Sequence, residues 1–283
     1  MDHFVFLAVL FAAACHAAWN ASIKGTLDPL ATTVLIALGA GLVALPPIAW
    51  FGLPGPAAWP WLLASVLIHI FYFAGLIESY RVGDLGQVYP IARGAAPLMT
   101  ATMTTLFVGE RLGLYGWAGI VLLAAGVLLL SLRGGRDLTR LDRRAVGFAL
   151  FTALSICSYS VVDGIGVRAA GQGRAAAYTL VLFVAIAPTV IGYALWRRGV
   201  AVLPAMRPYW KIGLGGGALA VISYSIALWA MTMAPIAIVA ALRETSVLFG
   251  ALIAVVFLAE PLRAARIGAA IMIVCGLVLL RMA

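Results

Sequence analysis

Two arginines lie at equivalent places inside apolar segments of this sequence. Arg93 and Arg243 are 150 positions apart. The same offset pairs Leu98 with Leu248, Phe107 with Phe257, Glu110 with Glu260 and Gly126 with Gly276. A guanidinium offers a planar fork of donors that matches carboxylate or phosphate oxygens. The arginine pair therefore indicates either an anion-binding site or structural ion pairs with carboxylates such as Glu78 and Glu244.

Other polar and aromatic residues recur on one face of the apolar segments. His16 and Asn20 are four residues apart with Trp19 beside them, so that they share one side of a helix. The candidate substrate-binding residues are His16, Trp19, Asn20, His69, Tyr72, Tyr80, Tyr89, Arg93, Tyr159, Asp163, Tyr224, Trp229 and Arg243. Alternatively, the histidines are neutral packing residues rather than titrating groups, and the aromatic residues belong to an interfacial belt.

The composition indicates which elements hold these side chains. Apolar residues make up 64% of the 283 positions and charged residues 10%. About 20 apolar residues cross a bilayer as a helix, and backbone groups in lipid must be paired internally. Ten such segments are expected: 4–23, 31–51, 61–80, 85–108, 114–132, 145–167, 176–196, 211–231, 236–258 and 264–280. The predicted fold is an all-α integral membrane protein, in which Pro90, Pro97 and Pro235 bend two of the helices.

The repeat divides the chain into two halves. Residues 1–132 and 145–283 each hold five segments, joined by the charged loop 133–144. An odd number of helices per half inverts the second half relative to the first, around a central cavity. Most Lys and Arg residues of the connections follow odd-numbered segments, which predicts a cytoplasmic central loop and outside termini. Glu110 and Glu260, at segment ends, are interpreted as architectural groups that cap the next helix.

Several function classes find no support in the sequence. It has no metalloprotease, hydrolase or phosphate-loop motif and no Cys/His ligand cluster, so we expect no cofactor or metal. The three cysteines, at 15, 157 and 275, are interpreted as packing residues. The net charge of +9 lies mostly in loops and lacks the aromatic-flanked basic face of a nucleic-acid binder. An intramembrane enzyme using His16, His69 or Asp163 stays an alternative, and a sensor is a weaker one.

The stretch FAGLIESYRVGDLGQVYPIARGAAPLMTATMTTLFVGERL, followed by GWAGIVLLAAGVLLL, resembles the EamA-type repeat of the drug/metabolite transporter superfamily. The matching features are Pro97 in mid-helix, the Gly109-Glu110-Arg111 ending, and Gly119 and Gly126 in the following segment. The second half matches less well, with Ala259-Glu260-Pro261 and no proline at Val247. The resemblance implies ten helices in two inverted repeats, with the cavity lined by the first, third, fourth, sixth, eighth and ninth segments.

The resemblance also implies a function. Members of this family commonly export amino acids or related metabolites across the bacterial inner membrane. Aromatic side chains and an arginine suit a solute with a carboxylate and a ring, so the aromatic amino acid exporter branch is the leading hypothesis. A proton-coupled exporter of small cationic or lipophilic drugs is the alternative, weakened because the first segment carries His16 and Asn20 rather than a carboxylate. The expected partners are a small molecule and the bilayer, and the oligomeric state is left open, with a monomer compatible.

Overall fold

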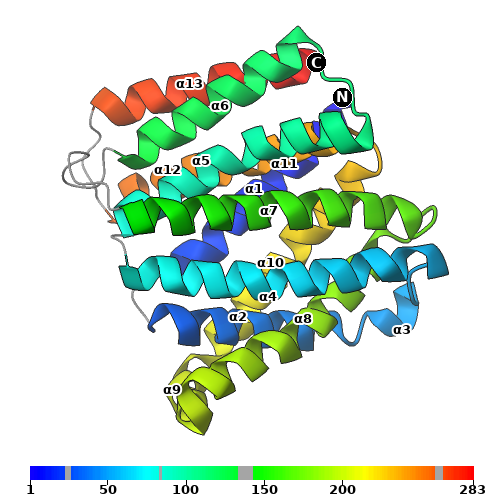
Figure 1. Cartoon of the computed structure of the whole chain (residues 1–283), viewed down its shortest axis with the longest axis vertical. Coiled ribbons are helices and arrows are strands. Elements are labelled where there is room, and N and C mark those ends of the chain that lie inside the picture. The colour runs from blue at the N-terminus through cyan, green and yellow to red at the C-terminus, as the bar shows by residue number, and fades with distance from the viewer. Residues whose placement is uncertain (23–26, 83–84, 133–142, 259–263) are drawn as a thin grey trace.

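The described part of the protein is helical throughout. A computed structural model describes residues 1–22, 27–82, 85–132, 143–258 and 264–283, and these contain no β-strand. Figure 1 shows the long helices lying side by side in a stack. The α-helices are α1 (His3–Ser22), α2 (Pro29–Ala44), α3 (Ile48–Phe51), α4 (Trp59–Val82), α5 (Leu85–Met103), α6 (Leu114–Leu132), α7 (Arg143–Ala169), α8 (Ala175–Arg198), α9 (Val202–Met206), α10 (Trp210–Met231), α11 (Ile236–Arg243), α12 (Ser246–Leu258) and α13 (Ala264–Met282).

Each of the ten apolar segments contains helix, but two of them are broken. The segment 31–51 divides into α2 and α3 at Leu45-Pro46-Pro47, because proline has no N–H to continue the helical ladder. The segment 236–258 divides into α11 and α12 after Arg243. There the N–H groups of Glu244 and Thr245 bond to carbonyls three residues back, and the Thr245 hydroxyl also donates to the carbonyl of Leu242. The break turns the chain directly after an arginine inside an apolar stretch.

The expected proline bends are replaced by other features. The helix α5 is continuous from Leu85 to Met103 across both of its prolines, and Pro235 precedes α11 as its N-cap residue. Beyond α5 the chain makes a π-helical turn over Thr104–Val108, which ends at Gly109 with a left-handed φ of 76°. Glycine adopts this conformation without a Cβ penalty, and the resulting turn directs Glu110 away from the end of α5.

Helix pairing follows the division of the chain into halves. The helix α1 packs on α10 and α12, and in the same way α7 packs on α4 and α5. The helices α2 and α8 contact each other, as do α6 and α13, which form one end of the stack in Figure 1. Gly126 of α6 lies against Ile273 of α13, and Gly276 lies against the backbone of Gly119, so the α6–α13 axes approach closely.

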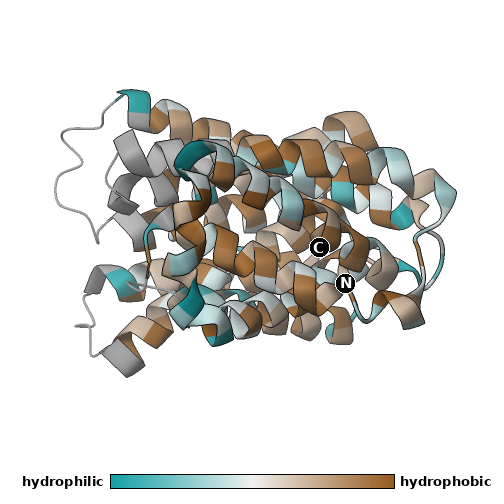
Figure 2. Ribbon diagram, turned by 90° about the horizontal axis from the view of Figure 1, so that it is seen from below, coloured by the Kyte–Doolittle hydropathy of each residue, from teal (hydrophilic) through white to brown (hydrophobic). Residues whose placement is uncertain are grey.

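The outer surface is strongly apolar. On α1, Phe4, Leu7 and Phe11 are 70%, 61% and 59% exposed, whereas Val5 and Val9 face the interior. Figure 2 shows hydrophobic colour along the middle of the helices and hydrophilic colour mainly toward their ends. Five described stretches are long and apolar enough to cross a membrane: 3–21, 56–73, 146–169, 175–231 and 236–256. A surface of this kind is typical of a multi-pass membrane protein.

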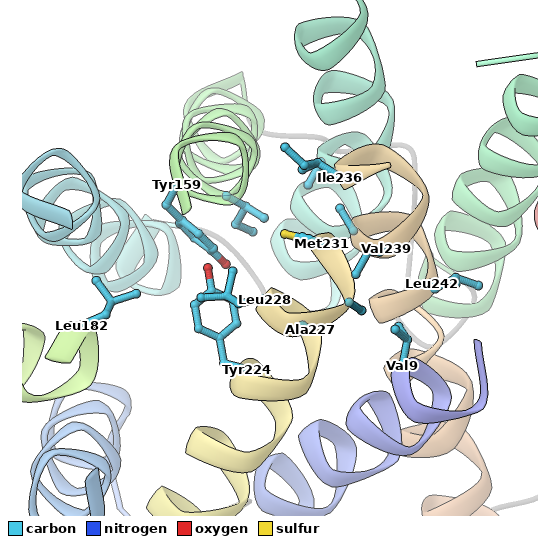
Figure 3. Packing of buried hydrophobic residues seen from close by; sticks show 14 of the residues in the cluster. Val9, Tyr159, Leu182, Tyr224, Ala227, Leu228, Met231, Ile236, Val239 and Leu242 are labelled. Carbon is cyan, nitrogen blue, oxygen red and sulfur yellow. The ribbon is translucent and has the colours of Figure 1, made fainter. Parts of the chain in front are cut away.

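The core lies where the two halves meet. Figure 3 shows buried side chains from both halves, among them Val9 of α1, Tyr159 of α7, Tyr224 of α10 and Val239 of α11, gathered between the helices. Residues 236–242 of α11 are all buried. Cys15 and Cys157 are buried as expected, but Cys275 is exposed on α13, so it is not a packing residue of the interior.

Candidate substrate-binding site

A central cavity of about 270 Å³ lies between the halves. It is lined by nine of the residues singled out from the sequence: His16, Trp19, Asn20, His69, Tyr72, Arg93, Tyr159, Tyr224 and Arg243. They come from α1, α4, α5, α7, α10 and α11, which belong to the six segments that were expected to line the cavity. The sixth contribution comes from α11 only, since the ninth segment is broken after Arg243.

Two helices outside the expected set also line the cavity. Thr32 and Thr33 contribute from α2, and Leu182 and Phe183 contribute from α8. The expected set of six lining segments is therefore incomplete. The two helices reach the wall because they pack against each other and against α10. The adjacent threonines near the start of an apolar segment were the available sequence signal for α2, whereas the α8 residues are indistinguishable from ordinary packing residues.

The remaining candidate residues lie elsewhere. Asp163 is fully buried on α7 behind the wall, and it reaches the cavity only through Tyr224. Trp229 does not line the cavity and instead packs edge-on against Phe4, with ring centroids 5.9 Å apart. Tyr80 and Tyr89 fall on α4 and α5, but their side chains lie outside the described part of the chain.

Aromatic rings form one continuous part of the wall. The His69 ring stacks on Tyr159, with centroids 4.4 Å apart and planes 26° apart. Tyr72 meets Tyr159 edge-on at 5.5 Å, and Tyr159 meets Tyr224 edge-on at 6.4 Å. Figure 3 shows Tyr159 and Tyr224 pointing toward one another from α7 and α10. Such a surface suits an aromatic or large apolar group, which gains both burial and edge-to-face contacts.

The two arginines of the repeat differ in their surroundings. The Nε atom of Arg93 is 2.8 Å from Oε2 of Glu244, and its Nη2 donates to the Ser246 hydroxyl at 2.8 Å. Arg243 instead lies over the Tyr224 ring, with its guanidinium carbon 4.7 Å from the centroid. Within the described residues Arg243 has no ion pair or hydrogen bond. The structural interpretation therefore fits Arg93, and the anion-binding interpretation fits Arg243.

Hydrogen bonds fix the orientation of two further groups at the wall. His69 Nδ1 lies 2.8 Å from the carbonyl oxygen of Ser65, one turn back on α4. Because a carbonyl oxygen only accepts, Nδ1 carries the proton and Nε2 of the neutral ring is left as the acceptor. On α1, the Asn20 amide donates to the carbonyl of His16 at 2.8 Å, and the ring of His16 lies edge-on to Trp19. These contacts set the rings within the wall rather than binding a ligand themselves.

The charge on the cavity wall has one sign. Among the described residues that line it, Arg93 and Arg243 are the cationic side chains and there is no Asp or Glu. The described residues also contain no cluster of three or more His, Cys, Asp or Glu side chains able to hold a metal ion. The described wall can thus attract an anionic group to Arg243 and stack a ring beside it.

The cavity extends toward one end of the molecule. Trp19 and Asn20 lie at the end of α1, and Thr32 lies near the start of α2, so the wall reaches toward that end. At the other end, Glu110 accepts the N–H groups of Ile236 and Ala237 at 2.7 and 3.2 Å. The expected architectural role of Glu110 thus involves the start of α11 in the other half, and not the next helix along the chain.

Comparison with known proteins agrees with this arrangement. Residues 3–132 match the EamA-like transporter family. A curated relative, the "Uncharacterized transporter in cobO 3'region" of Sinorhizobium sp, is 33% identical over 79 residues, which cover 28% of this chain and 55% of that protein. The chain thus matches about half the length of this relative. Both matches are to proteins described as transporters.

A solved crystal structure has the same fold as this chain. It superposes with a TM-score of 0.80 at 16% identity, covering 100% of this chain and 99% of that one. At this identity the likeness concerns the fold alone.

Proposed function

We propose that this protein is a secondary transporter of amino acids with aromatic or large apolar side chains, or of related metabolites, working by alternating access. The observation that carries the proposal is Arg243, a guanidinium at the cavity wall that forms no ion pair or hydrogen bond within the described residues. In this proposal the carboxylate of the bound solute serves as the counter-ion of Arg243. Its ring or alkyl group lies against Tyr159, Tyr72 and His69.

The proposed architecture is ten membrane-spanning helices in two inverted repeats, residues 1–132 and 145–283, joined by the loop 133–144. The pairing of helices supports it, because the contacts of α1 with α10 and α12 have counterparts in those of α7 with α4 and α5. In the proposed topology the loop 133–144 is cytoplasmic and the membrane is the bacterial inner membrane. Export is the direction that the family resemblance favours.

A cationic drug is the competing substrate class. Arg243, together with the absence of acidic side chains from the described wall, disfavours a cation, because like charges repel strongly where water is scarce. An intramembrane enzyme would need a nucleophile and a base in contact. Asp163, the one candidate acid among its proposed catalytic groups, instead bonds to two tyrosine hydroxyls behind the wall.

The test is uptake into liposomes that contain the purified protein. The probes are labelled phenylalanine, tryptophan, threonine and a quaternary ammonium dye, offered with no pH gradient. We expect phenylalanine and tryptophan to move and the dye to stay outside. Arg243→Gln should lower phenylalanine uptake about 10- to 100-fold, the equivalent of a lost charge-assisted hydrogen bond.

The control removes a guanidinium elsewhere. Arg207 is exposed on the surface, so that Arg207→Gln should transport at the wild-type rate. Movement of the dye alone would replace the substrate class by cations. Equal loss in both variants would show that net charge, rather than the position of Arg243, controls uptake.

A further inference from the structure

A buried carboxylate lies one side chain behind the proposed carboxylate site. The Oδ2 atom of Asp163 accepts the Tyr224 hydroxyl at 2.5 Å, and Oδ1 accepts the Tyr178 hydroxyl at 2.9 Å. The Arg243 guanidinium lies over the ring face of Tyr224. A single tyrosine therefore connects the negative group to the positive group. Neither charge is neutralised by a direct ion pair within the described residues.

Among the described residues of the neighbouring helices, none brings a second acid into contact with Asp163. From α4 come Ser65 and His69, whose ring interacts electrostatically with the carboxylate. Tyr178 comes from α8 and Tyr224 from α10, while Arg243 of α11 lies across the Tyr224 ring. The nearby Arg93–Glu244 ion pair, between α5 and the residue after α11, is internally neutral. Arg243 therefore lies on the other side of Tyr224 from Asp163, and it also interacts electrostatically with Glu244.

This arrangement makes the occupancies of the two groups interdependent. When a solute carboxylate binds Arg243, the positive charge facing Tyr224 is neutralised, and a negative charge on Asp163 then becomes less favourable. When Asp163 is protonated, Arg243 is left without a compensating charge and binds an anion more tightly. Thermodynamics requires this coupling to be reciprocal. With about one tyrosine ring between the two groups, occupancy of one site should raise the affinity of the other roughly fivefold.

We propose that Asp163 is a proton-binding site coupled to Arg243, so that one proton and one carboxylate solute occupy the transporter together. This inference rests on the proposed function. A hydronium ion in the cavity gives its proton to the carboxylate, which passes from charge −1 to neutral, and the remaining water molecule stays in the cavity. The neutral acid accepts a hydrogen bond from the hydroxyl of one tyrosine. It donates its own O–H to the hydroxyl oxygen of the other tyrosine, so that both tyrosine contacts persist.

The hydrogen bonds also define a route for the proton. Asp163 has no place on the cavity wall, but Tyr224 and His69 line the cavity and lie between the solvent and the carboxylate. Because Nδ1 of His69 donates to Ser65, its Nε2 is available to accept a proton. Under this coupling, export carries a proton outward with each solute, and an inward proton gradient drives uptake instead.

The first experiment counts protons. Binding of L-phenylalanine, and of 3-phenylpropionate as the matched probe without an ammonium group, is measured calorimetrically in phosphate and in Tris at one pH. The difference between the buffers gives the protons exchanged on binding. We expect proton uptake with both probes in the wild type and none in Asp163→Asn. The variant mimics the protonated acid, so it should also bind 3-phenylpropionate about fivefold tighter at pH 8.

Release of protons on binding would overturn the proposal, because it would mean that solute and proton compete. Unchanged proton uptake in Asp163→Asn would overturn the assignment to this residue. If that variant does not fold, Tyr178→Phe offers a second variant, because it removes a donor to Asp163 away from the cavity wall. The wild-type sign of proton exchange also tests the proposal without any variant.

The second experiment separates this inference from the proposed function. Exchange of labelled phenylalanine between equal pools, with no gradient, tests transport. Accumulation above equilibrium under an inward acid gradient tests coupling. Exchange without accumulation would leave the proposed function in place and overturn the inference. No exchange with phenylalanine or tryptophan would overturn both, whereas exchange with gradient-driven accumulation supports both.

Discussion

Glu110, between α5 and α6 in the first half, forms an ion pair with Arg168, at the end of α7 in the second half. The distance from Oε1 to Nη2 is 3.0 Å, and Arg168 also donates to the carbonyl oxygens of Met231 and Ala234. Together with its bonds to the N–H groups that begin α11, Glu110 ties three helix ends from both halves together. Because residues 236–242 of α11 are buried behind this contact, the proposed alternating access would require the Glu110 contacts to break.

We therefore predict that Glu110→Gln loosens this end of the protein. The amide keeps one acceptor oxygen but loses the charge that holds Arg168 and the helix N-terminus. In a Cys275→Ser background, Val239→Cys is buried and should react slowly with maleimide. We expect Glu110→Gln to raise its labelling rate severalfold. The matched control is Arg111→Gln at the exposed neighbouring position. Equal labelling in the two variants would show that Glu110 does not close this end.

A second prediction concerns the Arg93–Glu244 ion pair. Both side chains are less than 10% exposed, so removing one partner leaves an uncompensated buried charge. Arg93→Gln and Glu244→Gln should each destabilise the protein by about 3–5 kcal/mol, and the double variant should lose less than the sum. Thermal unfolding in detergent provides the measurement. Additive losses would mean that the two residues do not act as a pair.

A third prediction concerns the contact between α6 and α13. A Cβ on Gly276 would lie 2.9 Å from the Gly119 carbonyl oxygen and from the Leu123 nitrogen, closer than real Cβ contacts. Gly276→Ala should therefore cost about 1–3 kcal/mol as the helices are forced apart. Gly268→Ala, on the same helix with nothing within 4 Å of its Cβ, is the control. We expect a lower melting temperature for the first variant and no loss for the second.

A fourth prediction concerns pH and the start of α2. Asp28 caps this helix and pairs with Arg198 at 2.8 Å. Partial burial alone would raise the pKa of Asp28, but the Arg198 guanidinium and the N–H groups of Ala31 and Leu30 hold it below 3.8. The folded state thus binds the proton more weakly than the unfolded chain does. The resulting stability is present at neutral pH and is lost as the pH falls through and below 3.8.

The matching measurement compares the melting temperatures of wild type and Asp28→Asn from pH 7 down into the acid range. Asparagine preserves the capping oxygen but removes the charge. We expect the difference between the two proteins to shrink as the pH falls below 3.8. The effect is small, because both side chains are more than one-third exposed and solvent screens the pair. A difference that grows in acid would contradict the assigned pKa direction.

Local sequence was sufficient to predict the helices and the residues worth following. Apolar runs of spanning length give helices because backbone groups in lipid have no other partners. The 150-residue offset identified both arginines, and polar residues inside apolar spans identified nine that line the cavity. The expected position of each helix was reliable for the same reason, except where Pro46-Pro47 or the turn after Arg243 interrupts the ladder.

Only the tertiary structure distinguished residues that look alike in the sequence. Arg93 and Arg243 share a place in the repeat, but the break after Arg243 sends Glu244 toward Arg93 and leaves Arg243 over Tyr224. Which polar group reaches which partner depends on the rotation and packing of helices far apart in the chain. The pairing of Glu110 with α11, and of Asp163 with Tyr178 and Tyr224, was decided in the same way. Periodicity within one segment contains no information about the neighbour that its polar face will meet.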